Sequence, residues 1–209
     1  MARDIPSLKG DAEAAVLHRG SHVQILAGAG TGKTEVMRQR ITALLAEGVP
    51  PEAIVGLTFN VDAGEQLKKR VEEAVEAHPR LGRKFLDRMN GCYIGTIHSY
   101  AFQLLQQYVP KYESYDVLDD HRLAAVLSRE ANRMELKKLT GKLYGSVKAF
   151  IANFDVVQNE MIPPASLTDP FKSVMAVFRE RLESYRLLTY GQQIVLAVRE
   201  LEKPEVFKQ

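Results

Sequence analysis

The segment from Ala27 to Thr34 reads AGAGTGKT, and its residue types suit a loop that holds a phosphate chain. Small residues let main-chain N–H groups point at the negative oxygens of a triphosphate, and a following helix adds its positive end. In such a loop Lys33 reaches the β- and γ-phosphates, and the hydroxyl of Thr34 binds Mg²⁺. The first position needs only a small residue, so Ala27 is compatible with this role. The spacing predicts an ATP–Mg²⁺ site.

Every residue of this segment is a predicted phosphate contact. The eight residues are Ala27, Gly28, Ala29, Gly30, Thr31, Gly32, Lys33 and Thr34. Lys33 and Thr34 are also the predicted catalytic residues, and Thr34 is the predicted Mg²⁺ ligand.

A phosphate loop requires a strand before it and a helix after it. The apolar run Val23–Ala27 predicts a buried strand that leads into the glycines. Further predicted elements are strands at 53–59 and 92–97 and helices at 34–46, 63–77 and 98–108. Strands that are apolar throughout and alternate with helices are typical of a parallel sheet with helices on both faces. We therefore predict an α/β fold for this part of the chain.

The character of the sequence changes after Pro110. From Asp119 to about Arg199 the apolar residues follow helical spacing, and no convincing strand is visible. One apolar face runs through Leu123, Val126, Leu127, Ala131 and Met134, and another through Phe171, Val174, Met175, Phe178 and Leu182. We predict an α/β domain over residues 1–110 and an all-helical subdomain over residues 111–209.

Composition sets only broad limits. The chain has 209 residues, of which 45% are hydrophobic and 26% charged, as in ordinary globular proteins. Cys92 is the single cysteine, which excludes an internal disulfide and suits a cytoplasmic location. The sequence has no apolar run of bilayer length and opens on no signal peptide, so no membrane partner is expected. A net charge of +2 does not by itself indicate nucleic acid.

Hydrolysis of a nucleotide also requires a carboxylate on a neighbouring strand to hold Mg²⁺. Asp119 and Asp120 follow the nearest apolar run, but a role in capping the next helix explains them better. Asp155 lies within a helical pattern and is no better placed. The chain therefore lacks an evident second catalytic element.

The phosphate loop resembles motif I of the UvrD/Rep/PcrA-type superfamily 1 DNA helicases, which also carry alanine at its first position. Leu57-Thr58-Phe59, followed by Ala63 and Arg70-Val71, resembles the next motif of that family. Further similar segments, in the family's order, are Gly95-Thr96-Ile97-His98-Ser99, Val117-Leu118-Asp119-Asp120, Asn159-Glu160 before Pro163-Pro164, and Leu188-Thr189-Tyr190-Gly191-Gln192-Gln193. The resemblance covers essentially the whole chain.

The resemblance implies a partial RecA-like P-loop domain with an inserted helical subdomain. It implies an ATP-dependent DNA helicase or translocase with 3′ to 5′ polarity, whose acidic DExx motif is expected after Gln209. On this basis the chain resembles an N-terminal fragment that is hydrolytically incomplete alone. The implied partners are single-stranded DNA and single-strand/double-strand junctions. The implied DNA contacts are Thr58, Phe59, Asn60, Thr96, His98 and Ser99.

Three positions depart from the family's pattern. Ala12 stands where the family has a glutamine that recognises adenine, and Glu35 stands where arginine is usual near the base. Both changes predict weak discrimination between ATP and other nucleoside triphosphates. Asp62 replaces a lysine and would repel DNA phosphates.

Alternatives remain open from the sequence. The chain is also compatible with a small P-loop nucleotide kinase, or with a non-catalytic DNA-binding module that retains a nucleotide site. Phe59 is equally compatible with a buried strand-end aromatic, and His98 with a helix-capping role. His18 and His22 have a spacing that a metal can use, but no further ligands accompany them, so we interpret them as surface residues.

Overall fold

A computed structural model describes residues 8–207 of the chain. The chain divides into two compact units, one up to Ile97 and one from His98 onward, and each is described by itself. The domain boundary near residue 110 stays a prediction, because packing units need not coincide with domains. Among the described residues, no helix combines the length and apolar character needed to cross a bilayer.

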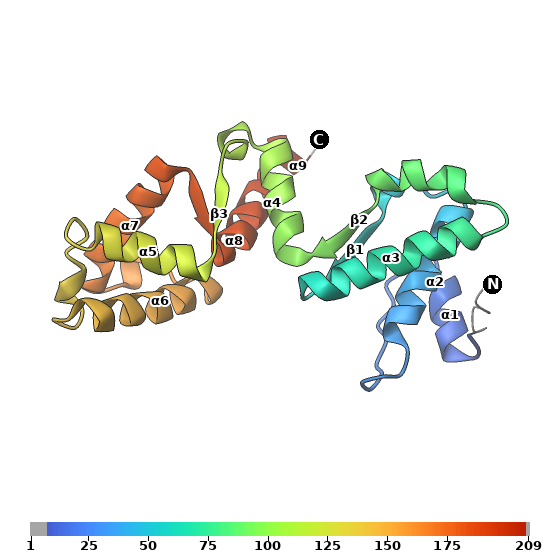
Figure 1. Ribbon diagram of the computed structural model, residues 1–209, viewed down its shortest axis with the longest axis horizontal. Helices are drawn as coiled ribbons and strands as arrows, with labels where there is room; N and C mark the ends of the chain where they lie inside the picture. Colours follow the sequence, from blue (N-terminus) through green and yellow to red (C-terminus); the bar gives the residue numbers. More distant parts are fainter. Residues whose placement is uncertain (1–7, 208–209) are drawn as a thin grey trace. The chain divides into compact units, whose positions relative to one another are not determined.

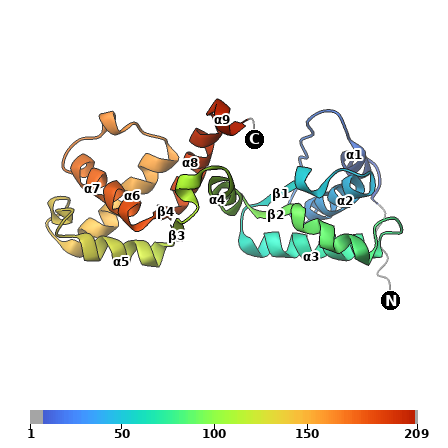
Figure 2. The same ribbon diagram turned by 90° about the horizontal axis from the view of Figure 1, so that it is seen from above.

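The first unit contains a two-stranded parallel sheet flanked by helices (Figure 1). Strands β1 and β2 pair in register, with Thr58 opposite Thr96 at their carboxyl ends. Helix α3 runs along this strand pair in both views (Figure 2). The elements in chain order are α1 (Asp11–Leu17), α2 (Lys33–Ala46), η1 (Pro51–Ala53), β1 (Val55–Thr58), α3 (Val61–Ala77), η2 (Arg83–Gly91) and β2 (Tyr93–Thr96).

The core of this unit forms where α2 and α3 meet one face of the sheet. Ile41 of α2 and Leu67 and Val71 of α3 are buried in it. Gly64 permits the close approach of α3, because a Cβ there would lie 3.2 Å from the Cα of Gly95. Helix α3 begins after Asn60, whose side-chain oxygen accepts the N–H of Ala63 at 2.8 Å.

The prediction of helices on both faces of the sheet is wrong for the described residues. Val55 and Leu57 share one face of β1, and their side chains are 40% and 39% exposed. The apolar character of the strand indicates that this face is suited to burial, but no described element covers it. The structure therefore shows a mixed α/β unit with a short parallel sheet, which is less than a complete RecA-like sheet.

The predicted strand at Val23–Ala27 is also wrong. The segment has no strand conformation, and Val23, Ile25 and Leu26 are exposed. A strand forms by exchanging main-chain hydrogen bonds with a neighbour. Among residues 8–207, β1 and β2 pair only with each other, so this apolar run has no strand beside it.

The second unit is mostly helical but contains a second parallel strand pair. Its elements are α4 (Ile97–Tyr108), η3 (Pro110–Tyr112), β3 (Asp116–Leu118), α5 (Asp120–Glu130), η4 (Leu136–Lys138), α6 (Leu143–Asn159), η5 (Pro164–Ser166), α7 (Phe171–Tyr185), β4 (Leu187–Thr189), α8 (Tyr190–Leu201) and α9 (Pro204–Phe207). Strands β3 and β4 pair in parallel, with Val117 opposite Leu188. The prediction of an all-helical subdomain without strands is therefore wrong. Strands this short carry too few residues for a period-of-two pattern to be visible.

A large apolar core joins α5, α6 and α7, which lie together in Figure 1. Phe150, Phe154 and Phe178 are fully buried there, and the ring centroids of Phe150 and Phe178 are 5.0 Å apart. Both predicted apolar faces contribute to this core, which confirms the helical interpretation. Asp119 caps α5 by accepting the N–H of Arg122 at 2.8 Å, which confirms its predicted capping role.

Candidate nucleotide and nucleic-acid sites

The predicted phosphate loop turns directly into α2. Gly30 and Gly32 have φ angles of 74° and 90°, which L side chains rarely adopt. Gly32 is the N-cap residue of α2, so the helix begins at Lys33. Thr31 fixes the turn by donating its hydroxyl to the carbonyl oxygen of Gly28 at 2.8 Å. The sequence folds this way because glycine alone tolerates the two left-handed positions without strain.

The loop presents hydrogen-bond donors that suit an anion. Within residues 8–207, the main-chain N–H groups of Gly30, Thr31 and Gly32 have no hydrogen-bond partner. Those of Lys33 and Thr34 belong to the first turn of α2, where no helical carbonyl precedes them. All five residues are exposed. A phosphate at this helix end would satisfy these donors and interact with the positive end of the helix dipole.

The ammonium group of Lys33 is turned back onto its own loop. Its Nζ donates to the carbonyl oxygen of Ala27 at 2.7 Å and to that of Gly28 at 2.5 Å. Because the side chain is exposed and long, it is free to exchange these oxygens for phosphate oxygens. The residues present therefore fit a bound phosphate chain.

A cavity of about 500 Å³ lies between α1 and the phosphate loop. Lys33 and Thr31 line it on the loop side, and Ala12 and Ala15 line it from α1. The position that the family resemblance assigns to adenine recognition thus shares a cavity with the phosphate-loop lysine. His18 also lines this cavity, with Nε2 2.8 Å from the hydroxyl oxygen of Ser21. The sequence interpretation of His18 as a plain surface residue missed this location.

Glu35 is held within its own helix. Its carboxylate accepts hydrogen bonds from both Nε and a terminal nitrogen of the Arg38 guanidinium, the Nε contact at 2.9 Å, and from Nε2 of Gln39 at 2.7 Å. The hydrogen bond from Arg38 holds the pKa of Glu35 below its ordinary value, against the opposing effect of burial. The charge of Glu35 is therefore paired by the buried Arg38.

The described residues contain no cluster of three or more histidine, cysteine or acidic side chains suited to a metal ion. The predicted Mg²⁺ ligand Thr34 is exposed, and its hydroxyl has no hydrogen-bond partner in the described part of the chain. A hydroxyl at this position fits a cation bridged to bound phosphates, since Mg²⁺ in such sites keeps few protein ligands.

The end of β1 presents the first group of predicted DNA contacts. Phe59 is 95% exposed, so it is not a buried strand-end aromatic. The hydroxyl of Thr58 donates to the carbonyl oxygens of Asn60 at 3.0 Å and Gly95 at 3.2 Å. These contacts, and the cap that Asn60 forms on α3, hold the turn that displays Phe59. An exposed aromatic ring on a fixed turn is suited to stacking against a nucleobase.

The remaining predicted contacts lie around the end of β2. Thr96 is buried and pairs in register with Thr58, which brings these two residues together. His98 and Ser99 lie in the first turn of α4 and belong to the second unit. The ring of His98 packs edge-on against Tyr190 at a centroid distance of 5.6 Å. The DNA-binding roles of these residues stay predictions.

Comparison with known proteins identifies the lineage of this arrangement. The sequence profile of the UvrD/REP helicase N-terminal domain matches residues 8–209. The chain belongs to this family. It is 29% identical over 199 residues to ATP-dependent DNA helicase UvrD1 of Mycobacterium bovis, covering 86% of this chain and 24% of that protein.

Two further relatives bear related names. DNA helicase II of Haemophilus influenzae is 31% identical over 114 residues, which cover 53% of this chain and 15% of that protein. An ATP-dependent helicase/nuclease polypeptide of Lactobacillus acidophilus is 26% identical over 183 residues, which cover 82% of this chain and 15% of that protein. The chain thus spans between 15% and 24% of the lengths of these UvrD/REP-type relatives.

Two features of the site escaped the sequence analysis. One is the cavity position of His18, which lies three residues beyond Ala15 and six beyond Ala12, a spacing that marks one helix face. The other is the pairing of Glu35 with Arg38, at a separation of three residues on α2. Both spacings are visible in the sequence once α1 and α2 are accepted as helices.

Proposed function

We propose that this chain is the nucleotide- and single-stranded-DNA-binding portion of an ATP-dependent DNA helicase or translocase. The observation that carries the proposal is the pair of left-handed glycines that turn five N–H groups and Lys33 toward one exposed helix end. Membership of the UvrD/REP helicase N-terminal domain family supports it. The 3′ to 5′ polarity belongs to the proposal through family resemblance, as does a location in the cytoplasm.

ATP and Mg²⁺ are the proposed ligands of the loop. Residues 27–34 surround the phosphates, Lys33 neutralises the terminal ones, and the hydroxyl of Thr34 holds Mg²⁺. When bound, the metal ion offsets negative charge that develops on the phosphates. Because the chain spans at most 24% of the length of the relatives described above, we assign to it binding and only a part of the hydrolytic machinery.

Recognition of the base is proposed to be weak. Ala12 offers no side-chain donor or acceptor to adenine, and the carboxylate of Glu35 is already bonded to Arg38 and Gln39. The walls of the cavity are mostly small and apolar residues, which contact any purine or pyrimidine alike. We expect ATP and GTP to compete on nearly equal terms in a displacement titration, and a strong preference for ATP would contradict this part of the proposal.

Single-stranded DNA is proposed to pass over the carboxyl ends of β1 and β2. Phe59 supplies a stacking surface, while Thr58 and Asn60 hold the turn. Thr96, His98 and Ser99 are the further proposed contacts, and junctions between single and double strands are the proposed substrates of the whole protein. Asp62, exposed in the first turn of α3, weakens attraction to the DNA backbone.

Two variants of the 209-residue chain test these assignments separately. Lys33→Ala should weaken binding of ATP–Mg²⁺ by about tenfold or more, because a charged contact to phosphate is lost. Phe59→Ala should weaken binding of an oligothymidylate of about 12 nucleotides by about tenfold, because one base–aromatic stack is lost. Isothermal titration calorimetry measures the first and fluorescence anisotropy the second.

Each variant serves as the control for the other, since neither side chain packs in a core. Lys33→Ala should leave the DNA affinity unchanged, and Phe59→Ala should leave the nucleotide affinity unchanged. In the full-length protein, Lys33→Ala should abolish DNA-stimulated hydrolysis and strand separation. Undiminished unwinding by that variant would contradict the proposal and would favour a non-catalytic nucleotide site.

A further inference from the structure

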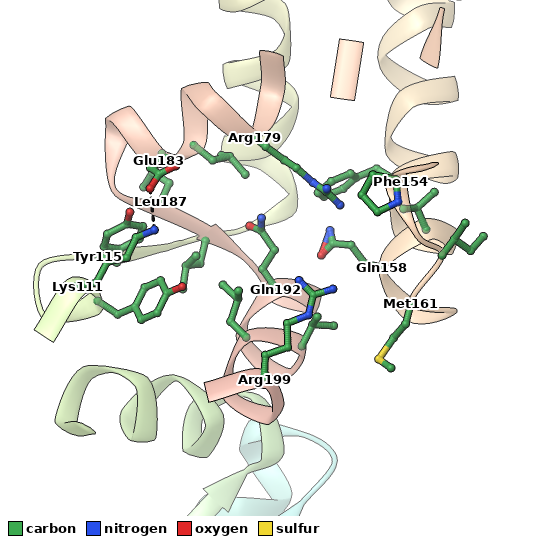
Figure 3. Close-up of a pocket in the computed structure, with 18 residues that line it drawn as sticks. Lys111, Tyr115, Phe154, Gln158, Met161, Arg179, Glu183, Leu187, Gln192 and Arg199 are labelled. Carbon is green, nitrogen blue, oxygen red and sulfur yellow. Dashed lines mark hydrogen bonds and ion pairs between the residues drawn. The ribbon is translucent and has the colours of Figure 1, made fainter. Parts of the chain in front are cut away.

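A cavity of about 290 Å³ in the second unit brings together two arginines from different helices. Arg179 comes from α7 and Arg199 from α8 (Figure 3). The side chains of Gln158 and Gln192 lie between the two guanidinium groups in that view. All residues that line the cavity belong to the second unit, so this feature is separate from the phosphate loop.

The two guanidinium groups have no anionic partner in the part of the chain that the structure describes. Neither Arg179 nor Arg199 forms an ion pair or a hydrogen bond with residues 8–207. Glu183 is the one acidic residue in the lining, and it is bound to Lys111 at 2.7 Å. Burial and then the charge of Arg199 lower the pKa of Arg179, as expected for like charges in a partly dehydrated site. An anion placed between them would relieve this repulsion.

The two glutamines are oriented by Thr189 at the start of α8. The side-chain oxygen of Gln192 accepts the N–H of Thr189 at 2.9 Å, and that of Gln158 accepts the Thr189 hydroxyl at 3.0 Å. Gly191 allows Gln158 to come this close, because a Cβ there would lie 2.7 Å from its Oε1. The NH₂ group of Gln192 has no partner among the described residues, so it is available as a donor to a ligand.

The rest of the lining favours a peptide over a nucleic acid. Met161, Ile162 and Val195 provide an apolar wall. The aromatic residues of the lining, Tyr112, Tyr115 and Phe154, are all buried, so they offer no open ring face on which a base can stack. Ligand pockets range from about 300 to about 1,000 Å³, and a cavity at the lower end holds one or two side chains.

We propose that this cavity binds an acidic segment of a partner polypeptide. A carboxylate of the segment lies between Arg179 and Arg199 and accepts from both guanidinium groups, which match carboxylate geometry. An adjoining apolar side chain of the segment packs against Met161 and Val195, and the NH₂ group of Gln192 donates to a peptide carbonyl. This role does not depend on the proposed helicase function.

Selection from a phage-displayed random-peptide library tests the proposal. The 209-residue chain is the target, and the chain carrying R179Q and R199Q is the counter-target. We expect enrichment of peptides in which Asp or Glu adjoins Leu, Ile, Phe or Met. The labelled consensus peptide should lose about tenfold or more in affinity for the double variant by fluorescence anisotropy, and replacing its acidic residue by the amide should have a similar effect.

The matched control carries K137Q and K172Q, which also remove two positive charges from exposed positions of the second unit but outside the cavity. This variant should bind the consensus peptide within about twofold of the unchanged chain, since exposed distant charges are screened. Circular dichroism verifies that both double variants retain their helical content. Three results would overturn the proposal: no enriched sequence, an enriched sequence without acidic residues, or an oligothymidylate whose affinity falls on R179Q/R199Q while the peptide's does not.

Discussion

The two units of the chain present their functional groups in opposite ways. In the first unit the candidate site consists of main-chain N–H groups and one lysine on an exposed turn, at the edge of a small core. In the second unit the polar groups of the arginine cavity lie beside a larger core built around three buried phenylalanines. The first arrangement depends on backbone conformation and the second on side-chain packing.

This difference indicates how each site responds to substitution. A turn that depends on left-handed glycines is disrupted by a single added methyl group, although almost nothing packs against it. A cavity beside a close-packed core tolerates changes at its rim but is lost when the core itself is opened. Stability and ligand affinity should therefore separate between the units.

The largest effect is expected in the phenylalanine core. Phe178→Ala should lower the free energy of unfolding by about 3–5 kcal/mol, because it removes a fully buried ring and leaves a void between Phe150 and Phe154. Urea denaturation followed by circular dichroism measures this loss. Val71→Ala in the core of the first unit is the comparison and should cost less, since it removes two methyl groups. An equal or larger loss at Val71 would contradict the contrast between the cores.

An intermediate effect is expected at the phosphate loop. Gly32→Ala places an L side chain at φ 90°, a conformation that costs about 1–2 kcal/mol, and should weaken ATP–Mg²⁺ binding by about tenfold as the loop relaxes away from it. Gly28→Ala is the matched control, because its Cβ would meet only Thr31 Cγ2, at an ordinary 3.7 Å. Calorimetric titration of both variants compares them. Similar losses at the two glycines would show that space, and not backbone conformation, limits the loop.

The smallest effect is expected from Glu35. The hydrogen bond from Arg38 holds its pKa below the ordinary value of 4.5, so the folded state favours the ionised form. This stabilisation is present above the unfolded pKa and is lost as pH falls through the folded pKa. The Tm of the unchanged chain should therefore exceed that of Glu35→Gln at pH 6, and the difference should shrink toward pH 3. A difference that grows on acidification would contradict the assigned direction.

The sequence predicted the elements whose signals are local. The glycine and lysine spacing of residues 27–34, the helices α2, α3 and α4, and the Asp119 cap all depend on residues a few positions apart. Strands β3 and β4 escaped prediction because each is three residues long and its partner lies some 70 residues away in the chain. The strand expected at Val23–Ala27 failed for the converse reason. Its apolar residues are suitable, but strand formation also requires a neighbour, which a local pattern does not reveal.

The arginine cavity also escaped the sequence analysis. Arg179 and Arg199 are twenty positions apart on two helices, and Gln158 lies on a third. Nothing in their local spacing distinguishes them from solvated surface residues, and only the packing of α6, α7 and α8 places them around one space.

The contact of Lys33 with the carbonyl oxygens of Ala27 and Gly28 makes nucleotide binding an exchange reaction. The incoming phosphates do not meet a waiting charge; they must compete with two oxygens that already solvate it. A single phosphate at the helix end can satisfy the N–H groups and leave the lysine where it is. A polyphosphate reaches further and offers the ammonium group a more negative partner. The closed lysine thus acts as a threshold that selects for chain length in the ligand, before any part of the protein examines the base.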